Sequence, residues 1–158
     1  MVINIIALGK LKEKYLLDAV NEYTKRLSPY CKVVINELTP VMLKENASKA
    51  EIDNALYKEA EAIRSKVMSG YTIAMCIEGT EISSEELAKK INDVAVSGNS
   101  NINIIIGSSF GLHDSIKKES DFKLSFSKMT FPHQLARVML LEQIYRAYMI
   151  NNNTKYHK

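Results

Sequence analysis

Short apolar segments alternate with amphipathic ones along the chain. Val2–Leu8 is a mostly apolar run rich in isoleucine, which predicts a buried strand. In Glu13–Leu27 the apolar residues recur every three or four positions, as on one face of a helix, and Pro29 ends the pattern. The next apolar run, Cys31–Leu38, predicts a second strand that is followed by a loop.

Two Ser-x-x-Glu sequences predict where the next two helices begin. In Ser48–Glu51 and Ser83–Glu86 the hydroxyl and the carboxylate can cap exposed backbone N–H groups reciprocally. The first of these helices is expected to extend to about Met68 and the second to end at Gly98. Between them, Tyr71–Ile77 predicts a third strand.

The last third of the chain continues the alternation. Ile102–Ile106 and Phe122–Phe126 predict two more strands, with a short helical or irregular segment between them. Gln134–Ile150 predicts a long final helix. This order of elements favours an α/β fold, with helices on both faces of a mainly parallel sheet, in one domain over residues 1–158.

The final helix is apolar around most of its surface, whereas a helix at the surface of a monomer needs one apolar stripe. Two interpretations account for this pattern. Either one side of the helix packs against a second subunit, with Glu142 and Arg146 paired at the seam, or the helix lies in the core of one subunit.

Composition narrows the class of protein. Apolar residue types make up 46% of the chain and charged types 25%, which is typical of a globular protein. No apolar run is long enough for a membrane span, and the N-terminus has no basic leader, so we expect a cytoplasmic protein. Cys31, Cys76 and three scattered histidines lack metal-ligand spacing, and we expect no metal site.

Charge is distributed unevenly. Residues 128–158 hold five basic residues and one acidic residue, a balance of +4, whereas the preceding 127 residues hold 16 basic and 17 acidic ones. Such a patch attracts phosphate, although the same balance is common on solvated surfaces. Charge alone therefore leaves nucleic-acid binding open.

Candidate chemistry gathers in three loops that follow predicted strands, where open α/β sheets bind ligands. These loops are Ile77–Thr80, Gly107–Gly111 and Ser125–His133. The glycine spacing matches neither a dinucleotide fingerprint nor a phosphate loop. The third loop can offer backbone groups to a flat heterocycle while its phenylalanines exclude water, or it can be an ordinary strand end and helix start.

The C-terminal tail combines an aromatic ring, an imidazole and a cation in Tyr156, His157 and Lys158. These groups can stack on a base, titrate near neutral pH and pair with phosphate. A frayed chain end is the alternative.

Several ordered motifs carry a resemblance to a known family. Ile106-Gly107, Leu124–His133, Glu142–Ala147 and the terminal Tyr156–Lys158 together resemble the RlmH family. Its members are SPOUT-class methyltransferases that act on pseudouridine N3 in the large-subunit ribosomal RNA. The resemblance spans essentially the whole chain.

The resemblance implies a C-terminal region threaded into a deep trefoil knot, a homodimer formed through that region, and S-adenosyl-L-methionine held by the knot loops. One departure is Ser108, where the family usually has a second glycine. Met75 stands where leucine is common, an exchange that conserves volume. By position, the implied cofactor-binding residues are Met75, Gly107, Phe126, Ser127, Lys128, Met129, Thr130 and Phe131.

The resemblance also implies methylation of N3 of pseudouridine 1915 in helix 69 of the 23S rRNA, within the assembled 70S ribosome. We expect His157 and Tyr156 near the target base, with Arg146 as a charge stabiliser or a partner of Glu142. Two alternatives remain: a related knotted enzyme acting on tRNA or a ribose hydroxyl, and a ribosome-binding module without catalysis.

Overall fold

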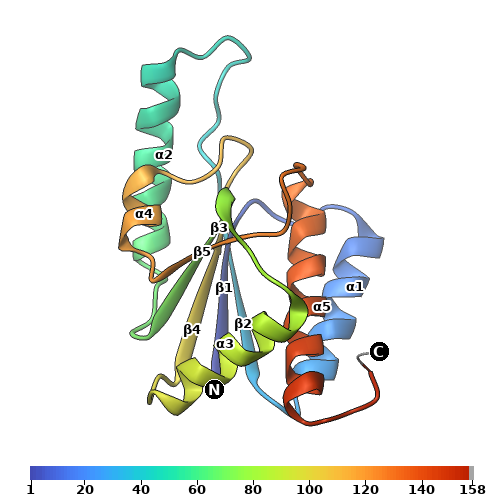
Figure 1. Ribbon diagram of the computed structural model, residues 1–158. Coiled ribbons are helices and arrows are strands. Elements are labelled where there is room, and N and C mark those ends of the chain that lie inside the picture. The colour runs from blue at the N-terminus through green and yellow to red at the C-terminus, as the bar shows by residue number, and fades with distance from the viewer. Residues whose placement is uncertain (157–158) are drawn as a thin grey trace.

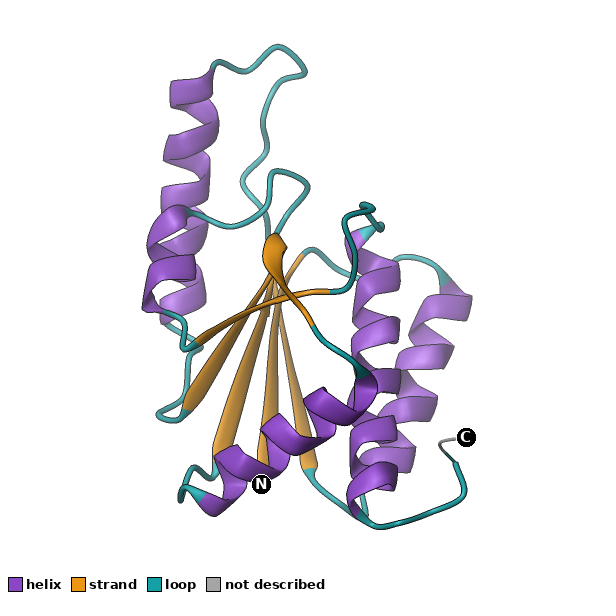
Figure 2. Cartoon of the chain, viewed as in Figure 1, coloured by secondary structure: helices purple, strands orange, loops and turns teal. Residues whose placement is uncertain are grey.

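The structure is a computed structural model that describes residues 1–156 (Figures 1 and 2). Within these residues the chain forms five strands and five helices. The strands are β1 (Val2–Leu8), β2 (Lys32–Leu38), β3 (Tyr71–Glu81), β4 (Asn101–Ile106) and β5 (Phe122–Ser125). The helices are α1 (Lys14–Leu27), α2 (Lys49–Arg64), α3 (Ser84–Val96), α4 (Asp114–Glu119) and α5 (His133–Asn151).

The strands form one parallel sheet in the order β2-β1-β4-β3-β5. Figure 1 shows α1, α3 and α5 on one face and α2 and α4 on the other. The predicted α/β fold, with a parallel sheet covered on both faces, is confirmed.

Alternating residues of the central strand β1 build two cores. Ile3 and Ile5 face α1, α3 and α5, where Leu141 and Ile144 of α5 are fully buried. Ile6 and Leu8 point to the opposite face, against α2 and α4. Successive side chains of a strand alternate between faces, so a continuous apolar run is what a doubly covered strand requires.

Helix α2 ends at Arg64, four residues before the expected end near Met68. Buried asparagines on two neighbouring strands account for the difference. The Asn4 side chain donates to the Lys66 carbonyl at 2.9 Å, and the Asn103 side chain both donates to the Met68 carbonyl and accepts from its N–H. These bonds replace helical ones, so the backbone leaves the helix.

Strand β3 is longer than predicted, because its last residues cross over β5 (Figure 2). Leu124 of β5 pairs first with Met75 and then, after a register shift, with Thr80. At Gly79 the two backbones touch: a Cβ there would lie 2.7 Å from the carbonyl carbon of Leu124. Only glycine permits such an approach. The trefoil knot stays a prediction.

Helix α5 packs between the sheet, α1 and α3 inside the chain, as the second interpretation of its pattern expected. Two of its apolar residues outside this core, Leu135 and Met139, are exposed and partly exposed, respectively. The subunit interface therefore stays a prediction. Among the described residues no helix has the length and hydropathy needed to cross a bilayer.

We expect Gly79→Ala to lower the free energy of unfolding by about 3 kcal/mol, because the added methyl overlaps the β5 backbone. Gly98→Ala is the matched control. Gly98 has φ +89° but no atom within 4 Å of an added Cβ, so only backbone strain of about 1 kcal/mol is expected. Urea unfolding measures the stability of both variants. If the two lose the same free energy of unfolding, the close approach of β3 and β5 at Gly79 does not contribute to stability.

Candidate functional site

A cavity of about 720 Å³ opens at the ends of β4 and β5, beside Met75–Glu78 of β3. All three predicted segments contribute to it, although Ile77–Thr80 lies within β3 and is not a loop. Seven of the eight predicted cofactor-binding residues line it, and Lys128, which is exposed, does not. The lining residues beyond those seven are Cys76, Ile77, Glu78, Ile106, Ser108, Ser109, Phe110, Gly111, Leu112, Lys117, Leu124, Ser125, Pro132, His133 and Ala136.

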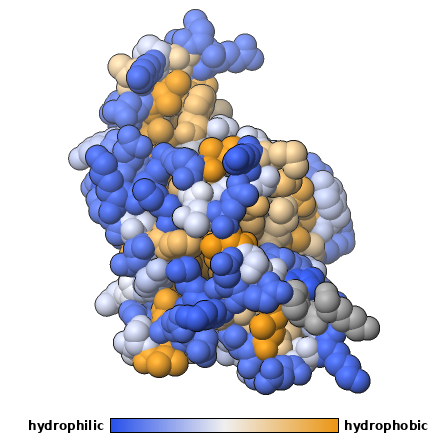
Figure 3. All heavy atoms as spheres, viewed as in Figure 1, coloured by the Kyte–Doolittle hydropathy of each residue, from blue (hydrophilic) through white to orange (hydrophobic). Residues whose placement is uncertain are grey.

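The wall formed by the loop after β5 is mainly apolar. Phe126 and Phe131 are partly buried, whereas Met129 is 68% exposed at the rim. Figure 3 shows apolar surface in the region where this loop meets the start of α5, between more hydrophilic surfaces. Such a wall can cover the face of a heterocycle and exclude water from it.

The opposite wall is a tight turn after β4. The Gly111 N–H donates to the Ser108 carbonyl at 2.9 Å and closes the turn. A Cβ at Gly107 would lie 2.4 Å from the Gly111 carbonyl oxygen, so no side chain fits at that position. Gly107 and Gly111 both line the cavity, so the turn offers it backbone without side chains at these two positions.

Ser108, the departure from the family pattern, is anchored to α2. Its hydroxyl donates to Glu59 Oε2 at 2.9 Å, while Glu59 Oε1 accepts the Val41 N–H at 3.0 Å. Glu59 is 5% exposed. Sequence reasoning missed it, although a carboxylate on the same helical face as Ala55 and Ile63 was a signal of a buried hydrogen-bond acceptor.

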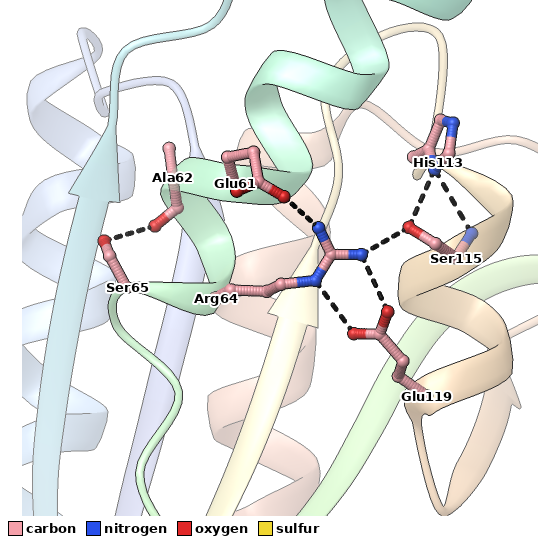
Figure 4. Close-up of polar contacts among 7 residues, drawn as sticks. All are labelled: Glu61, Ala62, Arg64, Ser65, His113, Ser115 and Glu119. Carbon is pink, nitrogen blue, oxygen red and sulfur yellow. Dashed lines mark hydrogen bonds and ion pairs between the residues drawn. The ribbon is translucent and has the colours of Figure 1, made fainter.

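Helix α4 is fixed to α2 by the network in Figure 4. Arg64 donates to Glu119 at 2.7 Å and to the Ser115 hydroxyl at 2.6 Å. That hydroxyl lies 2.8 Å from Nδ1 of His113, which also accepts the Ser115 N–H and so caps α4. The network sets the position of Lys117, which α4 carries to the cavity wall.

A second cavity of about 450 Å³ adjoins the first on the side of α1, α3 and α5. Both cavities are lined by Leu124, Ser125, Phe126 and Phe131. Glu142 and Gln143 of α5 and Tyr23 of α1 line the smaller one. Within residues 1–156 no group of three His, Cys, Asp or Glu side chains is placed to hold a metal ion.

Arg146 and Tyr156, two of the predicted catalytic residues, meet at Glu142. Arg146 Nη2 lies 2.6 Å from Glu142 Oε1, and the Tyr156 hydroxyl donates to the same oxygen at 3.2 Å. The Arg146 guanidinium also lies 4.9 Å from the centre of the Tyr156 ring. Burial, ahead of Tyr23 and Glu142, raises the pKa of Tyr156 to about 12, so its phenol is un-ionised at neutral pH.

Tyr156 therefore lies beside the smaller cavity, through its contact with Glu142, and neither Arg146 nor Tyr156 lines the larger one. Tyr156 is held by contacts rather than frayed. The third predicted catalytic residue, His157, lies outside the described residues, as does Lys158.

The positive charge of residues 128–158 is less available than the sequence indicates. Arg137 is 1% exposed and donates to Glu37 at 2.5 Å and to the Gly9 carbonyl at 2.8 Å. Arg146 is engaged by Glu142. Lys128 and Lys155 are exposed. The positive electrostatic field that this segment presents to a polyanion is therefore weaker than its +4 charge balance indicates.

Comparison with known proteins shows the family to which the chain belongs. A family described as "Predicted SPOUT methyltransferase" matches residues 1–157. The proteins named ribosomal RNA large subunit methyltransferase H in Clostridioides difficile (strain 630) and H 1 in Clostridium perfringens (strain SM101) are 51% and 52% identical to this chain. Both alignments span 159 positions and 100% of each chain. The chain belongs to the RlmH family of SPOUT methyltransferases.

The fold of this RlmH-family chain is shared with a solved structure, that of a probable methylase family protein from Haemophilus influenzae Rd KW20. The likeness has a TM-score of 0.53 and covers 99% of this chain and 70% of the other. At 16% identity it shows the fold alone.

We expect Ser108→Ala to lower the free energy of unfolding by about 1–3 kcal/mol, because it removes a donor from the buried Glu59 carboxylate. Ser109→Ala, on the exposed neighbour, is the control and should change stability by less than about 0.5 kcal/mol. Urea unfolding compares the two variants. If the Ser108→Ala and Ser109→Ala variants have the same free energy of unfolding, the Ser108 hydroxyl does not anchor the turn.

Proposed function

We propose that this chain uses S-adenosyl-L-methionine to methylate N3 of pseudouridine 1915 in helix 69 of the 23S rRNA, on the assembled 70S ribosome. One observation carries the proposal: the chain matches ribosomal RNA large subunit methyltransferases H over its full length. The segment Ser125–His133, which contributes to the wall of the larger cavity, supports it.

The larger cavity fits the cofactor. Its volume is within the ~300–1,000 Å³ typical of small-molecule sites, and it combines apolar side chains with the bare backbone at Gly107. Met75, Gly107, Phe126, Ser127, Met129, Thr130 and Phe131 would hold S-adenosylmethionine, with Lys128 outside the lining. When bound, the cofactor supplies an electrophilic methyl group on a sulfonium sulfur.

We place the target base at the smaller cavity, because this cavity shares Phe126 and Phe131 with the larger one and is lined by Glu142, which contacts Arg146 and Tyr156. N3 would lose its proton and accept the methyl group, while the bond between that methyl and the sulfonium sulfur would break and leave a neutral thioether. Arg146 is a fixed cation that can stabilise the charge developing on the base, and Tyr156 keeps its proton and offers a ring for stacking. The proton from N3 is assigned to His157.

A homodimer belongs to the proposal. Leu17 of α1 and Leu135 of α5 are 45% and 38% exposed, on the two helices that pack against each other. A second copy that covers this surface would also bury the remaining apolar side of α5.

Purified protein and tritiated S-adenosylmethionine should label unmethylated 70S ribosomes far more efficiently than 50S subunits or free rRNA. The reason is that Arg137 and Arg146, two of the five basic residues of 128–158, are already paired with carboxylates. Affinity from the contacts that are left falls steeply with salt, so a preformed ribosomal surface is needed. Mass spectrometry locates the modified nucleotide. Efficient labelling of free rRNA would contradict the ribosomal substrate. Methylation of tRNA or a ribose would favour the related enzymes, and binding without transfer would favour the non-catalytic module.

Deletion of residues 156–158 should leave binding of S-adenosylhomocysteine unchanged and lower turnover by about 10²-fold or more, the scale of a positioned acid–base group. The described contacts of Tyr156 are to residues outside the lining of the larger cavity. Calorimetry and single-turnover methylation measure the two effects, with exposed Tyr57→Phe on α2 as a control. Unchanged turnover would refute a catalytic tail, and lost binding would indicate a structural one.

A further inference from the structure

Two opposite charges lie on one wall of the larger cavity. Glu78, near the end of β3, and Lys117, on α4, both line it, and Lys117 Nζ lies 2.5 Å from Glu78 Oε1. The same ammonium lies 3.4 Å from Asp114 Oδ1. The side chains of Lys117 and Glu78 are 21% and 51% exposed, so the pair is sheltered on one side and open on the other.

Both groups are charged at neutral pH. The hydrogen bond from Lys117 lowers the pKa of Glu78 below its usual range. Burial opposes the charge on Lys117, but its contacts with Glu78 and Asp114 outweigh burial and raise its pKa. A ligand that enters the cavity therefore meets one carboxylate and one ammonium side by side.

Each charge is also held in place. Lys117 sits on α4, which Arg64 fixes to α2 through Glu119 and Ser115. Glu78 precedes Gly79, whose backbone lies against β5. Because an ammonium has three donors and a carboxylate has two oxygens, each group keeps capacity for a further partner after the pair has formed.

We propose that Glu78 and Lys117 bind the amino-acid end of the cofactor, with Glu78 accepting from its α-ammonium and Lys117 donating to its α-carboxylate. This inference rests on the proposed use of S-adenosylmethionine. The presence of opposite charges side by side favours this assignment, because the amino-acid end is a zwitterion and its two charges need a carboxylate and an ammonium as partners. A ribose diol would need only a hydrogen-bond acceptor such as Glu78. The apolar wall at Phe126 and Phe131 is left for the adenine.

The test compares two ligands by calorimetry. S-adenosylhomocysteine carries the amino-acid end, and 5′-methylthioadenosine keeps the adenine, ribose and thioether but lacks that end. In Glu78→Gln and in Lys117→Met we expect the Kd of S-adenosylhomocysteine to rise about 10-fold, the scale of one charge-assisted hydrogen bond. The Kd of methylthioadenosine should stay within about 2-fold, because it has no group for either side chain to bind.

Glu81→Gln and Lys118→Met are matched controls. Both residues are exposed, lie on the same two elements and are outside the cavity lining, so neither ligand should bind differently. If Glu78→Gln weakens both ligands equally, the carboxylate binds the ribose and the inference is wrong. It is equally wrong if neither variant changes the binding of S-adenosylhomocysteine. Failure of the unaltered protein to bind S-adenosylhomocysteine would instead overturn the proposed function.

Discussion

The backbone contact between β3 and β5 is the constraint on which the site depends. Where β3 crosses β5 at Gly79, the separation leaves no room for a side chain, and Leu124 pairs with β3 on both sides of the crossing. The crossing holds the last residues of β3 against β5 and so fixes β3 relative to the loop after β5. The β3 residues just before the crossing, Met75–Glu78, and the loop after β5 both line the larger cavity, so the crossing helps to set its shape.

Two buried charged side chains, Arg137 and Glu59, hold backbone segments in place. Arg137 joins α5 to the ends of β1 and β2 through Gly9 and Glu37, and Glu59 joins α2 to the turn after β4 through Ser108. A buried charge is tolerated when hydrogen bonds satisfy it, and those bonds also fix the segments that donate or accept them. The cost is a weaker external field, because an arginine held inside the protein is not available to phosphate.

The chemistry proposed for the protein is divided between two adjoining cavities. The larger one is built by strand ends and loops, and the smaller one by the helices α1, α3 and α5. Phe126 and Phe131 line both, which makes the loop after β5 the boundary between the proposed cofactor and the proposed target base. Glu142 organises the far side by engaging Arg146 and Tyr156 through one oxygen.

The sequence by itself determined the element order and both serine capping boxes, because these follow from local periodicity and short motifs. Through the family resemblance it also singled out eight residues as a proposed cofactor site, and seven of them line the larger cavity. Only the tertiary structure decided the early end of α2, the extension of β3 and the anchoring of Ser108. Each of these depends on a partner distant along the chain: Asn103 for the turn after α2, Leu124 for β3 and Glu59 for Ser108. Such contacts leave no periodic trace, because they are made by single polar groups or by the backbone, whose positions follow only from how the elements pack.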